Sequence, residues 1–170
     1  SNAGLMALNG RRALEILTKI GNSNAQGEYY LTDVVEIAPQ LGLAAKVIVA
    51  PETEVMGVND RVQLSNAEAV LQNRLRTQAM RDGVTMQDPA STYLSFDTKF
   101  GRDVVVEPHV VFGPGVILGD NVVIHAFSHL EGATLENSTS IGPFARLRPG
   151  AYMEETSRIG NFVEIKASRL

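Results

Sequence analysis

A six-residue repeat fills the second half of this sequence and restricts its fold more than any other feature. Large apolar residues recur at every sixth position, and one interval shortens to five. A period of six fits neither an α-helix, which repeats every ~3.6 residues, nor the simple alternation of a strand. Three hexapeptides instead complete one triangular coil of a β-helix. The repeating positions are Val106, Phe112, Leu118, Ile124, Leu130, Leu135, Ile141, Leu147, Met153, Ile159 and Ile165.

The residues around these positions support the same prediction. The residue after each large one is often glycine or acidic, and the fifth of each six is often small or β-branched. We expect the large side chain to fill a corner of the prism and the small one to face inward. Glycine would serve sharp turns with unusual dihedral angles. The predicted fold is a left-handed parallel β-helix, an exception to the right-handed crossover rule. Solenoids of other periods also space apolar residues regularly, but eleven matches with one slip favour the hexapeptide prism.

The first part of the chain predicts a different architecture. Helical spacing of apolar residues indicates helices at 10–21 and at about 32–41, and apolar runs indicate strands at 45–50 and 55–61. Helices that alternate with strands are typical of an α/β domain. These residues are too few to close a sheet, so we expect the end of a larger domain.

A helix is expected to connect the two parts. Ser65 and Glu68 form an S-x-x-E pattern, which predicts a capping box at its start, and Gly83 would end it. Residues 84–105 then read as a transition with a turn at Asp88-Pro89. The apolar face of this helix would consist of Val70, Leu71, Leu75 and Met80.

Composition narrows the function classes. The net charge is −4, and Lys and Arg are scattered, which argues against a nucleic-acid binder. The absence of cysteine excludes disulfides, thiolate metal sites and a cysteine nucleophile, and it fits a reducing cytoplasm. No apolar run approaches the ~20 residues of a membrane span, and no signal peptide is visible. Residues 1–3 look like the remnant of a cleaved tag, and the repeat stops in mid-pattern near residue 170, so we expect a fragment of a longer protein.

Four ordered segments carry a resemblance to a known family. They are 24–33 (Asn-Ala-Gln-Gly-Glu-Tyr-Tyr-Leu-Thr-Asp), 57–61 (Gly-Val-Asn-Asp-Arg), 141–150 (Ile-Gly-Pro-Phe-Ala-Arg-Leu-Arg-Pro-Gly) and 160–166 (Gly-Asn-Phe-Val-Glu-Ile-Lys). With them, the chain resembles the bacterial bifunctional N-acetylglucosamine-1-phosphate uridyltransferases / glucosamine-1-phosphate acetyltransferases over residues 4–170. These motifs are more specific than a hexapeptide run, which many acyltransferases share.

The resemblance implies two activities in the longer protein. A Rossmann-like nucleotidyltransferase domain, ending here in residues 4–61, would transfer UMP from UTP to N-acetylglucosamine-1-phosphate with Mg²⁺. A linker helix at 62–83 would lead to a left-handed β-helix, of which residues 84–170 would be the N-terminal part. This β-helix would form a homotrimer and acetylate glucosamine-1-phosphate from acetyl-CoA. The product, UDP-N-acetylglucosamine, is the precursor of peptidoglycan and lipopolysaccharide. The implied partners are these small molecules, without nucleic acid or membrane, in the cytoplasm.

The resemblance also assigns three site residues. Asn59 matches an asparagine that helps to hold Mg²⁺ and the sugar nucleotide, and an amide oxygen is a hard ligand suited to that ion. Without the motif, Asn59 would be a turn residue. Arg148 and Lys166 match two basic residues that bind the sugar phosphate, although both could be plain solvated charges. They lie 18 residues apart, so the period alone predicts that they stack on one face of successive coils.

The remaining machinery of the family falls outside this chain. The resemblance places the Gly-rich nucleotide loop before residue 4, and the catalytic histidine and the acetyl-CoA contacts after residue 170. His109, His125 and His129 do not match the family's histidine motif, so we expect surface or coil-packing roles for them. A histidine base would suit the substrate amine because its pKa lies near neutrality. We therefore expect no catalytic residue in this chain and no activity of the fragment in either reaction.

Two alternatives stay open. The chain could come from a single-activity sugar nucleotidyltransferase whose hexapeptide tail assembles or regulates the enzyme. The repeats could also be a trimerisation scaffold without chemistry. The motifs that contain Arg148 and Lys166 favour the bifunctional family over the first alternative. The second would be supported if Arg148→Ala and Lys166→Ala left both activities of the longer protein intact.

Overall fold

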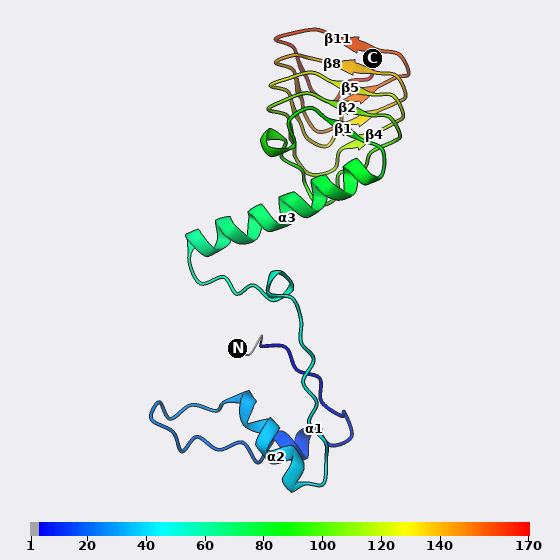
Figure 1. The fold of residues 1–170 in the computed structure, drawn as a ribbon. Coiled ribbons are helices and arrows are strands. Elements are labelled where there is room, and N and C mark those ends of the chain that lie inside the picture. Colours follow the sequence, from blue (N-terminus) through cyan, green and yellow to red (C-terminus); the bar gives the residue numbers. More distant parts are fainter. Residues whose placement is uncertain (1–3) are drawn as a thin grey trace. The chain divides into compact units, whose positions relative to one another are not determined.

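The computed structural model describes residues 4–170, which form two compact units (Figure 1). The first unit extends to Val58, and the second runs from Asn59 to Leu170. The boundary precedes the long helix, so that helix belongs to the same compact unit as the repeats.

The first unit is small and helical. Ile16 packs against Val34 and Ile37 at its centre. The helix expected at 32–41 is confirmed, whereas only the middle of the one expected at 10–21 is helical. The elements are α1 (Ala13–Leu17), the 3-10 helix η1 (Leu31–Asp33), α2 (Val34–Gln40) and the 3-10 helix η2 (Glu52–Glu54).

The two strands predicted for this unit are wrong. Residues 45–50 form no strand, and Val47, Ile48 and Val49 are 83%, 85% and 91% exposed. Residues 55–61 likewise form no strand. A strand needs a hydrogen-bonding neighbour as well as an apolar sequence, and residues 4–58 provide no such neighbour. The Rossmann-like character expected of this part is therefore not shown.

Helix α3 (Arg61–Arg81) opens the second unit, and its start differs from the prediction. The N-cap is Asp60, whose carboxylate accepts a hydrogen bond of 2.7 Å from the backbone N–H of Gln63. Ser65 and Glu68 lie inside the helix, so the predicted capping box is wrong. Glu68 instead accepts hydrogen bonds from the side chains of Gln72 (3.0 Å) and Tyr93 (2.5 Å). The expected end is confirmed, because the helix stops at Arg81 and Gly83 follows with a positive φ.

The buried face of α3 is also partly polar, unlike the predicted one. Gln72 is buried, and its side-chain amide donates to the carbonyl of Leu94 (2.7 Å) and accepts from the N–H of Leu94 (2.9 Å). Ala79 is buried and Leu75 packs on the same core, whereas the predicted Met80 is more than a third exposed. The C-terminal half of α3 thus lies against the first coil of the repeats (Figure 1).

Residues 85–165 form a parallel β-helix of two-residue strands. From β2 onward each strand pairs in parallel with the strand three places later in the chain, whereas β1 pairs with β2. The result is three sheets with the orders β1-β2-β5-β8-β11, β10-β7-β4 and β12-β9-β6-β3. A 3-10 turn, η3 (Pro89–Ser91), lies in the first coil. The strands are β1 (Thr85–Met86), β2 (Val105–Val106), β3 (Val111–Phe112), β4 (Ile117–Leu118), β5 (Val123–Ile124), β6 (His129–Leu130), β7 (Thr134–Leu135), β8 (Ser140–Ile141), β9 (Arg146–Leu147), β10 (Tyr152–Met153), β11 (Arg158–Ile159) and β12 (Glu164–Ile165).

The register confirms the period and its slip. Partners lie 18 residues apart, as in Val106↔Ile124, but 17 apart across the slip, as in Ile124↔Ile141. Ten of the eleven predicted positions are buried, and Ile159 packs at the edge of the same core. The pattern of large apolar residues therefore predicted one of the two inward-facing sets of side chains, and members of the predicted small or β-branched set, such as Val110 and Val116, are buried as well.

The repeat pattern did not predict the first coil, and only the family resemblance placed residues 84–105 with the β-helix. The coil begins at β1, and Tyr93 and Lys99 form single parallel bridges to β3 and β4. The buried residues Met86 and Leu94 lie eight positions apart in the sequence, whereas the repeat period is six. Because of this two-residue insertion, the first coil does not follow the six-residue period. The turn expected at Asp88-Pro89 lies between Met86 and Leu94.

Glycine plays the expected part only in some repeats. Among the glycines that follow large residues, Gly142 has a positive φ of 95°, whereas Gly113 and Gly119 do not. The left-handed turn positions come later in each repeat and are often occupied by other residues, such as His109 (φ 61) and Asn121 (φ 57). Gly119 is required by close approach instead, because a Cβ there would lie 2.5 Å from Oδ1 of Asn137 in the next coil.

No helix within residues 4–170 combines the length and the apolar character that a membrane crossing requires.

Candidate functional site

The structure brings the predicted pair of basic residues together. β9 pairs with β12, so Arg146 lies opposite Glu164 and Leu147 opposite Ile165. The next residues, Arg148 and Lys166, are therefore neighbours on adjacent coils, and the N–H of Arg148 donates to the carbonyl of Ile165 at 2.8 Å. Leu147 and Ile165 point inward and are buried. The residues that flank them consequently project from the outer face.

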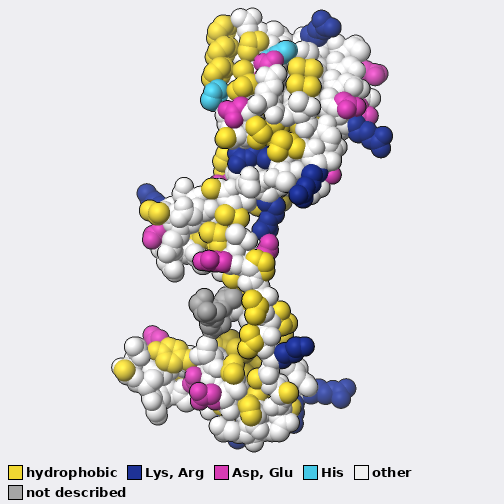
Figure 2. All heavy atoms as spheres, in the orientation of Figure 1, with side chains coloured by type: hydrophobic (Ala, Val, Ile, Leu, Met, Phe, Trp, Pro, Cys, Tyr) yellow, Lys and Arg dark blue, Asp and Glu magenta, His cyan; other side chains and the backbone are white. Residues whose placement is uncertain are grey.

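This outer surface, formed by Arg146, Arg148, Glu164 and Lys166 and called the basic face below, carries one acidic group among three basic ones. Oε1 of Glu164 lies 3.1 Å from Nη1 of Arg148 and 3.9 Å from Nη1 of Arg146. Lys166 has no ion-pair partner within 4.0 Å in the described part of the chain and is exposed. The net charge of the four groups is +2, which suits an anionic ligand. Elsewhere, the Lys and Arg side chains in Figure 2 are scattered and form no continuous stripe.

Asn59 lies apart in the sequence from this face, in the turn before α3. Its side chain is exposed, and its backbone N–H donates to Oε1 of Gln63 at 2.7 Å. The neighbouring Asp60 caps the helix. Within residues 4–170 there is no group of three or more acidic or histidine side chains that could hold a metal ion.

The three histidines occupy surface positions on the β-helix. His125 bridges three coils, since its Nδ1 lies 2.9 Å from Oε1 of Glu107 and its Nε2 lies 3.1 Å from Oγ of Ser140. The hydrogen bond from His125 lowers the pKa of the Glu107 carboxyl, and a second one from the N–H of Ala126 adds to the effect. His129 lies opposite Arg146 in the register of β6 and β9, one coil from the basic face.

His109 begins a column of stacked rings that the sequence interpretation missed. It stacks on Phe127 with ring centroids 4.8 Å apart, and Phe144 and Phe162 follow at 5.0 and 5.1 Å. All four residues have a positive φ, so they occupy equivalent corners of successive coils. The three phenylalanines are between 47% and 76% exposed. Hydrophobic side chains are visible along one edge of the β-helix in Figure 2. The signal in the sequence is an aromatic residue three positions after a large apolar one.

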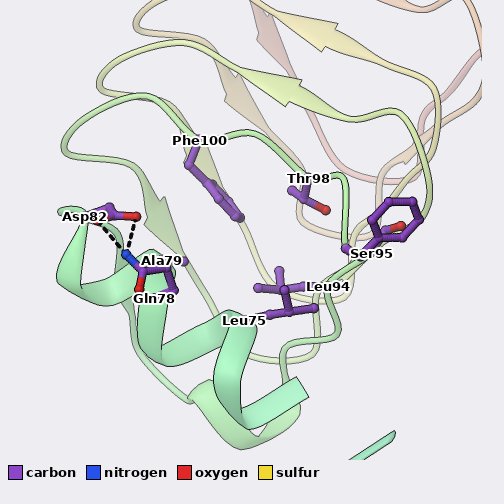
Figure 3. Close-up of a pocket in the computed structure, with 9 residues that line it drawn as sticks. Leu75, Gln78, Ala79, Asp82, Leu94, Ser95, Thr98 and Phe100 are labelled. Carbon is purple, nitrogen blue, oxygen red and sulfur yellow. Dashed lines mark hydrogen bonds between the residues drawn. The ribbon is translucent and has the colours of Figure 1, made fainter. Parts of the chain in front are cut away.

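A cavity of about 240 Å³ lies between α3 and the first coil (Figure 3). Its lining is mainly apolar, with Phe96 exposed beside it. Its one acidic group, Asp82, accepts two hydrogen bonds from the side chain of Gln78, at 3.0 and 2.9 Å. The cavity contains no basic side chain, so it does not compete with the basic face as a site for anionic substrates.

Comparison with known proteins gives one match to the β-helix alone and others to almost the whole chain. The family profile "Bacterial transferase hexapeptide (six repeats)" matches residues 97–132, inside the β-helix. Over almost the whole chain, the sequence is similar to proteins named "Bifunctional protein GlmU". The one from Azorhizobium caulinodans is 64% identical over 167 residues, which is 98% of this chain and 37% of that protein. The resemblance to the bifunctional GlmU proteins is confirmed.

Other GlmU proteins match at similar extent. That of Agrobacterium fabrum is 55% identical over 99% of this chain and 37% of its own length, and that of Zymomonas mobilis is 46% identical over 99% and 38%. The chain thus spans little more than a third of the GlmU relatives that it matches. Among solved structures, the acetyltransferase domain of PglB from Neisseria gonorrhoeae in complex with acetyl coenzyme A is similar to 65% of this chain and 58% of that one. Its identity is 18% and its TM-score 0.38, too low to bear on the fold or the ligands of this chain.

Proposed function

We propose that this chain is part of a bifunctional transferase that makes UDP-N-acetylglucosamine, and that its basic face binds the phosphate of glucosamine-1-phosphate during acetyl transfer from acetyl-CoA. The observation that carries the proposal is the adjacency of Arg148 and Lys166 on neighbouring coils. A guanidinium and an ammonium group side by side supply several donors and two positive charges to one phosphate monoester.

The basic face would contribute binding and orientation. Holding the phosphate at Arg148 and Lys166 would fix one end of the sugar and present its amine to the thioester of acetyl-CoA, which reduces the entropy cost of the encounter. The base that takes the proton of the amine is not assigned to a residue of this chain. UMP transfer from UTP with Mg²⁺ belongs to the proposal for the longer protein, where Asn59 would supply one oxygen ligand.

Kinetics of thiol release test the acetyltransferase role. In a protein of GlmU length that contains this chain, Arg148→Ala and Lys166→Ala should each raise the KM for glucosamine-1-phosphate about 10- to 100-fold, because each removes a charge-assisted hydrogen bond worth ~1.5–3 kcal/mol. The KM for acetyl-CoA should change little. Arg158→Ala is the matched control, since Arg158 is exposed on a different sheet. Unchanged kinetics in both variants would favour the scaffold alternative.

We also propose that the β-helix self-associates as a homotrimer. The exposed ring column supports this, because soluble monomers rarely expose contiguous apolar patches of this kind. Phe144→Asn removes one ring without straining its positive φ, which asparagine tolerates. Light scattering should show a trimer for the unchanged chain and smaller species for Phe144→Asn. A trimer of equal stability in both would exclude the column from the interface.

A further inference from the structure

The basic face contains an internal competitor for any anion that binds there. Glu164 lies opposite Arg146 in the strand register, yet its carboxylate leans diagonally toward Arg148 and pairs with it at 3.1 Å. Arg148 is the residue that the proposed function assigns to the sugar phosphate. In this structure its guanidinium is therefore already occupied by a carboxylate.

A phosphate monoester could not share Arg148 with that carboxylate without a cost. It carries about −1.5 to −2 charges at neutral pH, and two anions on one guanidinium repel each other. Glu164 must then turn away or find another cation. Because its side chain is half exposed, such a movement meets little steric resistance.

Besides Arg148, Arg146 is the cation that lies within 4.0 Å of the Glu164 carboxylate among the described residues. Its Nη1 lies 3.9 Å from Oε1 of Glu164, only 0.8 Å farther than that of Arg148. A side-chain rotation would complete the pair, since the backbones of β9 and β12 are held by their register. The groups opposite on neighbouring coils do not replace it. His129, opposite Arg146, lies two coils from Glu164, and Glu131, one coil before Arg148, is itself acidic.

We propose that Arg146 is a positioning residue that receives Glu164 when a phosphate monoester occupies Arg148. This inference rests on the proposed phosphate site. It adds an exchange of ion-pair partners, called the relay below, in which Glu164 leaves Arg148 and pairs with Arg146. Arg146 raises phosphate affinity by removing the competing carboxylate, without contacting the phosphate. Glu164 in turn lowers the affinity of the face for weakly bound anions by holding Arg148.

The test is a binding cycle on this chain with glucosamine-1-phosphate as the probe. Dissociation constants would be measured at fixed ionic strength from the ¹⁵N-NMR shifts of the Arg148 and Lys166 amides. From the size of exposed ion-pair energies, Arg146→Gln should weaken binding roughly two- to fivefold, and Glu164→Gln should tighten it by a similar factor. The double variant should bind like Glu164→Gln alone, because Arg146 then has no carboxylate to receive. Arg146→Lys should restore binding close to that of the unchanged chain.

Each outcome separates the two claims. If Arg146→Gln weakens binding equally with and without Glu164, Arg146 contacts the phosphate directly and the relay is wrong. If Arg146→Gln changes nothing while Arg148→Ala abolishes binding, the phosphate site stands and the relay fails. If the unchanged chain shows no saturable shifts, or Arg148→Ala binds as well as it does, the proposed phosphate site itself fails. All substituted side chains are exposed, and an unchanged amide spectrum elsewhere confirms folding.

Discussion

Gly101→Ala should destabilise the β-helix more than its small size suggests. A Cβ at Gly101 would lie 2.4 Å from the carbonyl carbon of Gly119 and 2.5 Å from Oδ1 of Asp120, both in the next coil. An ordinary contact begins at 3.4 Å, so the coils would have to separate locally by about 1 Å. Gly101 has no positive φ, and the cost is therefore steric.

The magnitude follows from what that separation breaks. Overpacking of this kind costs ~1–3 kcal/mol. The same movement lengthens two hydrogen bonds of 2.7 Å, from the N–H of Gly101 to the carbonyl of Leu118 and from the N–H of Arg102 to Asp120. Each is worth ~1 kcal/mol. Reduced entropy of the unfolded chain offsets ~0.4–1 kcal/mol of this cost, so we expect a net loss of about 2–5 kcal/mol.

Urea unfolding followed by circular dichroism measures this loss, and Gly160→Ala is the control. No atom lies within 4 Å of a Cβ at Gly160, and its φ is not positive, so that variant should stay within ~0.5 kcal/mol of the unchanged chain. With a slope of ~1–3 kcal/mol/M, the midpoint for Gly101→Ala should fall by about 1 M or more. If the two variants unfold within about 0.5 kcal/mol of each other, close coil stacking is not what requires glycine at position 101.

Three further predictions concern α3 and the His125 network. Gln72→Leu should cost about 2–4 kcal/mol, because it leaves the buried N–H and carbonyl of Leu94 without their partner; a loss below about 1 kcal/mol in thermal unfolding would contradict this. Asp60→Ala should cost ~0.5–2 kcal/mol and reduce the helical signal, and an unchanged helical signal would speak against its role as N-cap. The folded-state pKa of Glu107 is lowered, so its stabilisation exists above the unfolded pKa of ~4.3 and disappears as the pH falls through the folded value. The unchanged chain should therefore be more stable than Glu107→Gln at neutral pH and lose this advantage progressively as the pH falls below ~4.3; an advantage that does not change with pH would refute the assignment.

The repeat was predictable because its information is local. A residue such as Leu130 or Ile141 is large and apolar because it fills the interior of the prism, and the interval between such residues is set by the coil itself. The slip after Leu130 was legible for the same reason, and it appears in the structure as a register of 17 instead of 18. The repeat pattern did not reveal the first coil, because the interval between Met86 and Leu94 is longer than the six-residue period.

The first unit shows the opposite case. The apolar run around Val47–Val49 has the composition of a buried strand, but strand formation depends on partners that the run itself does not specify. The start of α3 was misplaced for a subtler reason, because both Asp60 and Ser65 are good N-cap residues. Asp60 prevails, and Gln63 accepts from the N–H of Asn59 while donating its own N–H to Asp60, a reciprocal arrangement similar to a capping box.

Only part of the candidate site could be read from the chain. The spacing of Arg148 and Lys166 predicts their stacking, since a whole number of hexapeptides separates them. The diagonal pairing of Glu164 with Arg148 does not follow from the period, because rotamers and charges decide it. The ring column that includes Phe127 and Phe144 was missed because turn positions were expected to hold glycine.

The central claim is that Arg148 and Lys166 together bind the sugar phosphate. A crystal structure of a GlmU-length protein containing this chain, with glucosamine-1-phosphate bound, tests it most directly. The account predicts phosphate oxygens within about 3 Å of both Arg148 and Lys166. A phosphate bound elsewhere, with Arg148 still paired to Glu164 and Lys166 free in solvent, would contradict it.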